Sequence, residues 1–395
     1  MNRRKFIQNS ALLSATAFMP RFLFGLNDQV LNTGFKRLIV IQLSGGNDGL
    51  NMIIPREQDI YYKSRPTLAI SKGEQLVLND QQALHPNLSG LKKLYENGEL
   101  TIINNVGYPN PNRSHFRSMD IWQSGSGSEQ NWSTGWLGRY LESSNMESYQ
   151  GLEINDALSM ALKGAYRSGI ATSDPKKLKR QIDNRLIQSW IEAGISTHLN
   201  EHNQGYLYKT LIETGRSAEI INKSYTNNQG NLTYPNGAFA KQLKTTATLI
   251  SSPIETRVYY VSMTGFDTHA NQKGTQDRLM DQLDKGLSAF ISDLKKSGTF
   301  DDSLIMVFSE FGRRVRENAS KGTDHGAANN VLVIGRQLKK PGFWNAPADL
   351  SNLDANGDLI YQIDFRTIYA SILNDWLEVD SSKVLKGAFD GLEVV

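Results

Sequence analysis

Short apolar runs that alternate with longer amphipathic segments are the feature that most constrains the fold of this chain. Residues 36–43 (KRLIVIQL) form a nearly continuous apolar run, which is typical of a strand buried on both faces of a parallel sheet. Residues 272–296 instead repeat leucine and phenylalanine at spacings of three and four, which predicts one long helix with a single apolar stripe. Together the two patterns indicate an α/β protein.

The same alternation continues to the end of the chain. Further strands are predicted at 100–106, 257–263, 303–308 and 330–334, and further helices at 114–123, 238–251 and 364–377. Two polar helices at 176–198 and 206–223 are predicted to form an insertion that borders the functional site. We therefore expect residues 35–395 to form a single domain, with a doubly wound, mostly parallel sheet and helices on both faces.

The first 26 residues have the layout of an export signal. Arg3, Arg4 and Lys5 precede an apolar run at 11–18, and small residues at 15–17 offer a cleavage site. The run is shorter than the ~20 residues of a spanning helix, so no stable membrane span is expected. The arginine pair is typical of twin-arginine signals, which predicts a periplasmic or otherwise exported protein that meets the twin-arginine translocase during export. An ordinary basic signal or an uncleaved anchor is the alternative.

Composition excludes several classes of function. The chain has no cysteine, which rules out disulfides, thiolate metal sites and cysteine nucleophiles. Residues 1–26 contain four basic residues and no acid, so their removal changes the formal net charge from +3 to −1. This balance gives no electrostatic reason to expect nucleic acid as a partner. The absence of G-x-G-x-x-G after a strand disfavours a dinucleotide-dependent oxidoreductase.

Chemistry is expected where the strands end, because ligands of open α/β sheets bind beyond the carboxyl ends of the strands. After the first strand, Asp48 lies in a glycine-rich turn, either as a metal ligand or as an ordinary Asx turn. After the second strand, Ser114 stands where a helix begins, either as a nucleophile or as an N-cap. Arg113 and His115 flank this serine and are candidates to hold a phosphate or sulfate.

The later strands are also followed by polar residues. Asp267 and His269 offer a carboxylate oxygen and an imidazole nitrogen to one divalent ion. The alternative is that the carboxylate of the neighbouring aspartate simply caps the histidine. Glu310 is a further carboxylate at the same edge and Arg313 a candidate clamp for an oxyanion, unless both belong to a surface run of ion pairs. Asp324 and His325 are candidate metal ligands in what is alternatively a plain polar loop.

Six segments in this order resemble the motifs of the domain of unknown function 1501 (DUF1501) family of exported bacterial proteins. They are LSGGNDGLN (43–51), HPNL (85–88), NRSHF (112–116), FDTH (266–269), SEFGR (309–313) and GTDHG (322–326). The family in turn resembles the alkaline-phosphatase-like superfamily of phosphatases, sulfatases and phosphomutases.

The resemblance implies a role for each matching position. Asp48 would bind one metal beside the nucleophile Ser114, and Asp267 and His269 would bind the other metal. His325 would match the last histidine ligand of the relatives. Glu310 would stand where the relatives carry an Asp-His pair. Two departures affect the second metal site: the Asp-His spacing is two rather than four, and Phe311 replaces a histidine. The resemblance therefore implies a site that is altered, weaker or absent.

Two hypotheses about function follow. The first is an exported metal-dependent hydrolase of phosphate or sulfate esters, acting on small molecules or glycans with one or two zinc, manganese or calcium ions. The alternative is a catalytically inactive periplasmic binding or assembly protein on the same fold. The first hypothesis requires that the strand-end residues converge at one edge of the sheet. These residues are Asp48, Ser114, Asp267, His269, Glu310 and His325.

Overall fold

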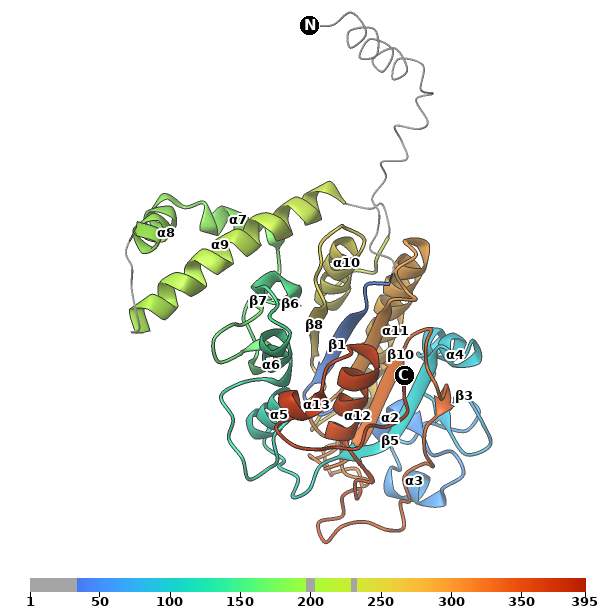
Figure 1. The fold of residues 1–395 in the computed structure, drawn as a ribbon. Coiled ribbons are helices and arrows are strands. Elements are labelled where there is room, and N and C mark those ends of the chain that lie inside the picture. Colours follow the sequence, from blue (N-terminus) through green and yellow to red (C-terminus); the bar gives the residue numbers. More distant parts are fainter. Residues whose placement is uncertain (1–33, 197–202, 229–232) are drawn as a thin grey trace, which may run out of the picture.

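A nine-stranded sheet runs through the middle of the molecule (Figure 1) in the computed structural model, which describes residues 34–196, 203–228 and 233–395. In order across the sheet, the strands are β11 (Gly342–Phe343), β5 (Leu100–Gly107), β10 (Asn329–Ile334), β9 (Ser303–Phe308), β1 (Arg37–Ser44), β8 (Val258–Thr264), β6 (Gly151–Glu153) and β7 (Ile170–Ala171), while β12 (Ile363–Asp364) also pairs with β5. Every pairing is parallel except the two made by β10. The prediction of a mostly parallel sheet is confirmed.

Both faces of the sheet are buried, as the apolar run of β1 predicts. Its side chains alternate, so that Ile39 and Ile41 enter one core while Leu38 and Val40 enter the other. The first core is covered by α4 (Ser89–Glu96), α10 (Ala238–Ile250) and α11 (Gln272–Lys296). The second is covered by α5 (His115–Ser124), α6 (Trp136–Ser143), α12 (Phe365–Ser371) and α13 (Ser381–Leu385). Helices on both faces make the fold doubly wound, as expected.

Stacked aromatic rings fill the second core. Trp122 lies between Phe308 and Phe365, with ring centroids 4.9 and 4.4 Å apart and nearly parallel planes. Trp136 stacks on Tyr369 at 4.1 Å in the same way. Because such side chains bury large apolar areas, this layer fixes α5, α6 and α12 against the sheet.

The predicted helical insertion forms an arm that leaves the body of the molecule (Figure 1). Its first predicted helix is two helices, α7 (Pro175–Ile182) and α8 (Arg185–Ser196), because the chain turns at Asn184, whose side chain accepts a hydrogen bond from the N–H of Leu186. The second is α9 (Asn203–Asn227), which packs on α10 and on η3 (Ser148–Gln150). Both partners precede the amino ends of strands β8 and β6. The arm therefore lies away from the carboxyl edge of the sheet, and the expectation that it borders the site was wrong.

The remaining elements surround the sheet. The predicted helix 364–377 is α12 followed by a π-helical turn, η5 (Ile372–Trp376). A small sheet has the order β2 (Ile53–Ile54), β4 (Ala83–Leu84), β3 (Leu76–Val77), and α2 (Gly49–Met52), α3 (Asp59–Ser64) and η4 (Met160–Leu162) complete the set. The predicted signal peptide at 1–26 lies outside the described residues. Among the described helices, none has the length and apolar character needed to cross a membrane.

Candidate functional site

Five chain segments meet at one edge of the sheet, where β1, β5, β8 and β9 end and the antiparallel β10 begins. The loops after β1 and β8 touch: a Cβ atom on Gly45, which has a φ of +121°, would lie 2.5 Å from the backbone nitrogen of Asp267. Only glycine allows that approach at that backbone angle. The geometry brings the predicted strand-end residues into one region, and the contacts of each side chain distinguish their roles.

Three histidines surround one carboxylate oxygen at this edge. The distances from Oδ1 of Asp267 to the Nε2 atoms are 3.1 Å for His269, 3.2 Å for His325 and 3.4 Å for His115. The Nε2 atoms of His269 and His325 are 2.9 Å apart. We call these four residues the His–Asp cluster. The loop after β8, the loop between β9 and β10, and the first residue of α5 contribute to it.

Two of the ring protons of the cluster are fixed by acceptors outside it. Nδ1 of His115 lies 2.9 Å from Oε1 of Glu310, and Nδ1 of His325 lies 2.7 Å from the carbonyl oxygen of Arg113. Because carboxylate and carbonyl oxygens only accept hydrogen bonds, both Nδ1 atoms carry the proton. In its neutral form, each ring then directs an Nε2 lone pair at Asp267. The Nε2 of His115 is buried and has no hydrogen-bond partner.

The third ring is held in the same way. Nδ1 of His269 lies 3.3 Å from Oδ1 of Asp324, which also accepts a hydrogen bond from Asn318. That hydrogen bond is the main reason why the pKa of Asp324 lies below its usual value. Asp324, predicted as a metal ligand, therefore lies behind His269 and directs the lone pair of the ring inward.

This arrangement fits a metal ion. Three inward lone pairs and a carboxylate oxygen repel one another unless a cation lies between them, and hydrogen bonds from the outer ring nitrogens are the usual support of metal-binding histidines. In a tetrahedral site with bonds of about 2.0–2.1 Å, neighbouring ligand atoms lie about 3.3–3.4 Å apart. The distances from Asp267 lie close to that value. His115, Asp267 and His325 place ligand atoms within 4.8 Å of one another, as one ion requires.

Local charges and burial shift the pKa values of the cluster. Partial burial raises the pKa of Asp267, but the hydrogen bond from Arg313 and the positive charge of that guanidinium outweigh it and hold the pKa at about 2. The hydrogen bond to Glu310 raises the pKa of His115, whereas burial lowers the pKa of His325. At neutral pH, Asp267 is therefore an anion and His325 is neutral, which are the forms that bind metal.

Glu310 was predicted as a metal ligand, and the structure places it one step outside the cluster. The residue is 1% exposed, and Oε1 accepts hydrogen bonds from His115 and from the N–H of Gly45. The carboxylate therefore orients His115 and joins it to the turn after β1. His115 was expected to hold substrate, but it faces Asp267 instead.

Asp48 differs most from expectation. It is buried and forms an ion pair with Arg65, with 2.6 Å between Oδ2 and NH1, and it accepts a hydrogen bond from Gln272 at 2.5 Å. Arg65 is itself fully buried, so the carboxylate already has its cation. Gln272 in turn accepts hydrogen bonds from Thr268 and Thr323, in the loops that carry the cluster. Asp48 thus supports these loops rather than joining the cluster.

Arg313 was predicted to clamp a substrate oxyanion, but its donors are directed at the protein. Nε and NH1 donate to the carbonyl oxygens of Gly46 and Thr323 at 2.6 and 2.8 Å. NH2 donates to Asp267 at 2.8 Å and also to the carbonyl oxygens of Gly45 and Phe266. The buried guanidinium therefore ties three loops together and holds Asp267 in place.

The segment before α5 contains the predicted nucleophile. Ser114 is exposed and is the N-cap residue of α5, yet its side chain makes no capping hydrogen bond. The side chain of Arg113 forms an ion pair with Asp358, with 2.6 Å between NH2 and Oδ2, and the fully buried Asp358 also lies 3.5 Å from Arg314. The sequence carries no signal for Asp358, because its partner is 245 positions away. Its contact anchors the residue whose carbonyl oxygen orients His325.

His85, in the HPNL segment, has a structural role. Its Nδ1 accepts a hydrogen bond from the N–H of Asn87, and its Nε2 lies 2.9 Å from Asp277 on α11. Burial is the main cause of its lowered pKa. The ring fastens the turn before α4 to α11.

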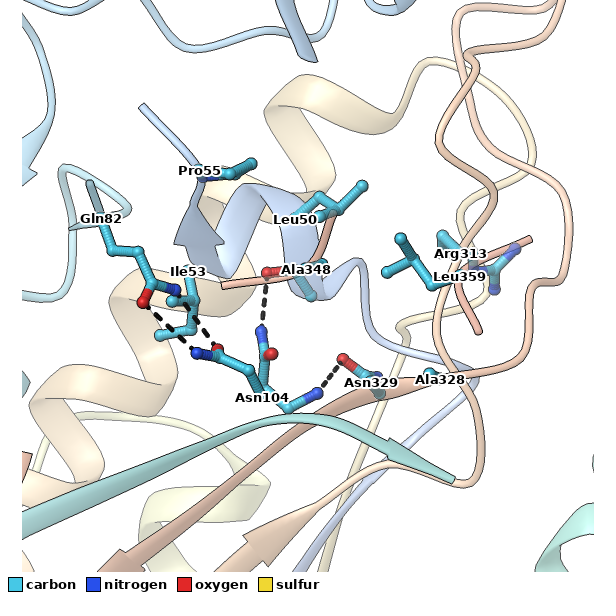
Figure 2. A pocket seen from close by; sticks show the side chains of 12 residues that line it. Leu50, Ile53, Pro55, Gln82, Asn104, Arg313, Ala328, Asn329, Ala348 and Leu359 are labelled. Carbon is cyan, nitrogen blue, oxygen red and sulfur yellow. Dashed lines mark hydrogen bonds between the residues drawn. The ribbon is translucent and has the colours of Figure 1, made fainter. Parts of the chain in front are cut away.

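A small enclosed cavity lies behind the edge (Figure 2), between the small sheet and the start of β10. Its volume of about 10 Å³ leaves room for about one water molecule. The amides of Gln82 and Asn104 pair across it at 3.3 Å. This cavity is therefore too small to hold a substrate.

The family of the chain follows from a comparison of its sequence with family models. The model described as "Protein of unknown function (DUF1501)" matches residues 99–388. The chain belongs to the DUF1501 family. A comparison of this DUF1501 protein with curated proteins found no match.

Solved structures similar to this DUF1501 protein include three bacterial proteins. A protein in the alkaline phosphatase superfamily from Vibrio parahaemolyticus is 11% identical, with a TM-score of 0.36, over 79% of this chain and 63% of that one. A phosphonate monoester hydrolase from Silicibacter pomeroyi is 10% identical, with a TM-score of 0.36, over 79% and 70%. The PsFucS1 sulfatase from Pseudoalteromonas sp. is 10% identical, with a TM-score of 0.36, over 90% and 72%. At these values the likeness carries no conclusion about chemistry.

Proposed function

We propose that this protein is an exported metal-dependent hydrolase of phosphate or sulfate esters, with one divalent ion held by the His–Asp cluster. The observation that carries the proposal is the set of three Nε2 atoms within 3.1–3.4 Å of Oδ1 of Asp267, each with its Nδ1 proton committed outward. Three imidazoles and one carboxylate favour zinc, whereas calcium prefers oxygen ligands alone. Such an ion acts as a Lewis acid on an ester oxygen and lowers the pKa of a bound hydroxyl group.

The residues around the cluster supply the other parts of the site. Ser114 directly precedes the ligand His115, and its hydroxyl is free of capping contacts, as a nucleophile requires. Because helix geometry leaves the first N–H groups of α5 without acceptors inside the helix, they favour a bound oxyanion. Arg113 and Arg313 are engaged with protein partners. In this proposal the ion and the start of α5, rather than an arginine clamp, stabilise charge on the ester.

The proposal is tested by turnover of aryl phosphate and aryl sulfate esters after the protein is loaded with zinc or manganese. We expect Ser114→Ala to lower kcat by at least about 100-fold while metal binding is unchanged. His325→Ala should lose both metal and turnover. Ser351→Ala, which changes an exposed serine on a distant stretch of the sequence, is the matched control and should behave as wild type. Turnover that persists in Ser114→Ala would remove the serine from the mechanism.

A second function is favoured by one observation, the engagement of both candidate arginines with carboxylates of the protein. A binding or assembly protein that uses the ion structurally needs no free cation for an oxyanion. In that case the loaded protein binds about one ion per chain but turns over none of the esters. The pair of measurements, metal content and turnover, therefore separates the two functions.

Export is part of the proposal and rests on Arg3, Arg4 and the short apolar run that follows. Folded export by the twin-arginine translocase would allow the ion to be inserted before translocation. Cell fractionation of wild type beside Arg3→Lys/Arg4→Lys tests it. We expect wild type in the periplasm and the variant retained in the cytoplasm, and equal distribution of both would refute the twin-arginine route.

A further inference from the structure

We propose that the tip of the helical arm, formed by α7 and α8, binds the surface of a membrane that contains anionic lipids. This inference goes beyond the proposed hydrolase activity and does not depend on it. It begins with two large apolar side chains on α8, Leu186 and Trp190, which are 57% and 48% exposed. Residues four apart lie on the same face of a helix, so the two form one exposed apolar stripe. On another face of α8, Ile191 packs toward Gly215 of α9.

The same tip carries a group of unpaired cations. Lys176, Lys177, Arg180 and Arg185 are exposed, and none of them forms an ion pair within the part of the chain that the structure describes. Lys179 differs, since it pairs with Asp183 and Glu219. On α7 the buried Ile182 faces inward, and helical spacing places Lys176 and Arg180 on the opposite face.

An anionic membrane is the partner that both features fit. Tryptophan and leucine beside lysine and arginine are typical of helices that lie in the interface of anionic bilayers, where the rings enter the headgroup region and the cations meet phosphate groups. A second copy of the chain is a poorer occupant, because a symmetric contact through this tip would bring two sets of unpaired cations together.

The position of the arm agrees with such a contact. α9 anchors the arm to α10 and η3, which precede the amino ends of β8 and β6. Figure 1 shows the arm leaving the body beside α10. The His–Asp cluster lies at the opposite, carboxyl edge of the sheet. A protein held to a membrane by the tip of the arm would therefore keep its candidate site open to solvent.

The test uses the full chain, which has no cysteine of its own. Ser189→Cys places one thiol on the exposed side of α8 beside Trp190, and an environment-sensitive fluorophore attached there reports entry into lipid. Ala355→Cys, exposed on the loop after β11, is the matched control position. Both labelled proteins carry the same N-terminal segment. Binding through that segment alone therefore cannot shift the emission of the label at 189 while the label at 355 stays unchanged.

We expect vesicles of phosphatidylglycerol and phosphatidylcholine to shift the emission of the label at 189 to the blue, with no shift at 355. Leu186→Ser/Trp190→Ser should abolish the shift. Arg180→Gln/Arg185→Gln should weaken binding about 25-fold, since each cation near an anionic membrane strengthens binding about fivefold. The proposal is overturned by an unchanged label with these vesicles, by an equal shift with phosphatidylcholine alone, or by a shift that depends on protein concentration without vesicles, which indicates a second copy.

Discussion

Replacing Glu310 with glutamine removes one negative charge from behind the His–Asp cluster and leaves the shape of the side chain nearly unchanged. In the wild type, the buried carboxylate accepts the Nδ1 proton of His115 at 2.9 Å and the N–H of Gly45 at 2.8 Å. The glutamine oxygen still accepts one of these hydrogen bonds, so the fold should persist. What changes is the electrostatic support of the His115 ring.

The expected loss is set by the usual effect of such outer partners. Mutation of a carboxylate that supports a metal-binding histidine lowers metal affinity by about 10–100-fold, or about 1.4–2.7 kcal/mol of binding free energy. The substitution also changes the pH dependence of metal binding, and it does so by making protons compete less well with the metal. The hydrogen bond to Glu310 raises the pKa of His115, and metal binds only the neutral ring, so protons compete with metal up to a higher pH in wild type. Without that carboxylate the pKa falls, and the midpoint for metal binding moves to lower pH.

Calorimetric titration with zinc between pH 5 and pH 8 measures both effects. Glu310→Gln should bind more weakly at pH 8 and show its half-maximal change at lower pH than wild type. Glu317→Gln is the matched control, because Glu317 accepts hydrogen bonds from the N–H groups of Thr67 and Leu68 and contacts no residue of the cluster. General disruption of the structure would lower affinity without moving the midpoint down. Unchanged affinity at pH 8, or a midpoint that moves up, would refute the assignment of Glu310.

Three further predictions concern stability. Arg65→Met leaves the buried carboxylate of Asp48 without a cation and should cost about 3–5 kcal/mol in urea unfolding, with a smaller loss indicating that the pair is not buried in solution. Trp122→Ala removes the ring between Phe308 and Phe365 and should cost about 3–5 kcal/mol in the same assay; a cost below 1 kcal/mol would contradict the packing of the second core. The pKa of Asp267 is depressed to about 2, so its stabilisation is present above its ordinary pKa near 4 and is lost as pH falls through about 2. Acid titration of the metal-free protein should show this loss in wild type and not in Asp267→Asn.

Much of the fold was predictable because its apolar pattern is strong. The bounds of α11 (Gln272–Lys296) and β9 (Ser303–Phe308) match the prediction at both ends, since an apolar stripe and a buried run each stop at polar or glycine-containing turns. The break between α7 and α8 was missed because Asp183 and Asn184 interrupt a polar helix without proline or glycine. The placement of the arm was also missed, since it depends on which element α9 packs against.

The candidate site was predictable only to the level of one sheet edge. Parallel strands bring their carboxyl ends together, so the positions of Asp267 and Glu310 followed from topology. His325 reaches the same edge because it precedes β10, which is antiparallel. The partner of each polar side chain did not follow from topology. Asp48 pairs with Arg65, a residue in an ordinary polar stretch, and Arg313 turns toward loop carbonyls because the loops leave it no path to solvent. Such pairings depend on tertiary distances, and no local pattern encodes them.

The central claim is that one divalent ion binds among His115, Asp267, His269 and His325, and the metal content of the protein tests it most directly. Wild type, His325→Ala and Asp48→Asn would be purified without chelators, equilibrated with zinc, passed through a desalting column and analysed by mass spectrometry of the metal, with circular dichroism to confirm folding. The account predicts about one ion per chain in wild type and in Asp48→Asn, and none in His325→Ala. A wild type that binds no ion, or an ion lost from folded Asp48→Asn but kept in His325→Ala, would contradict it.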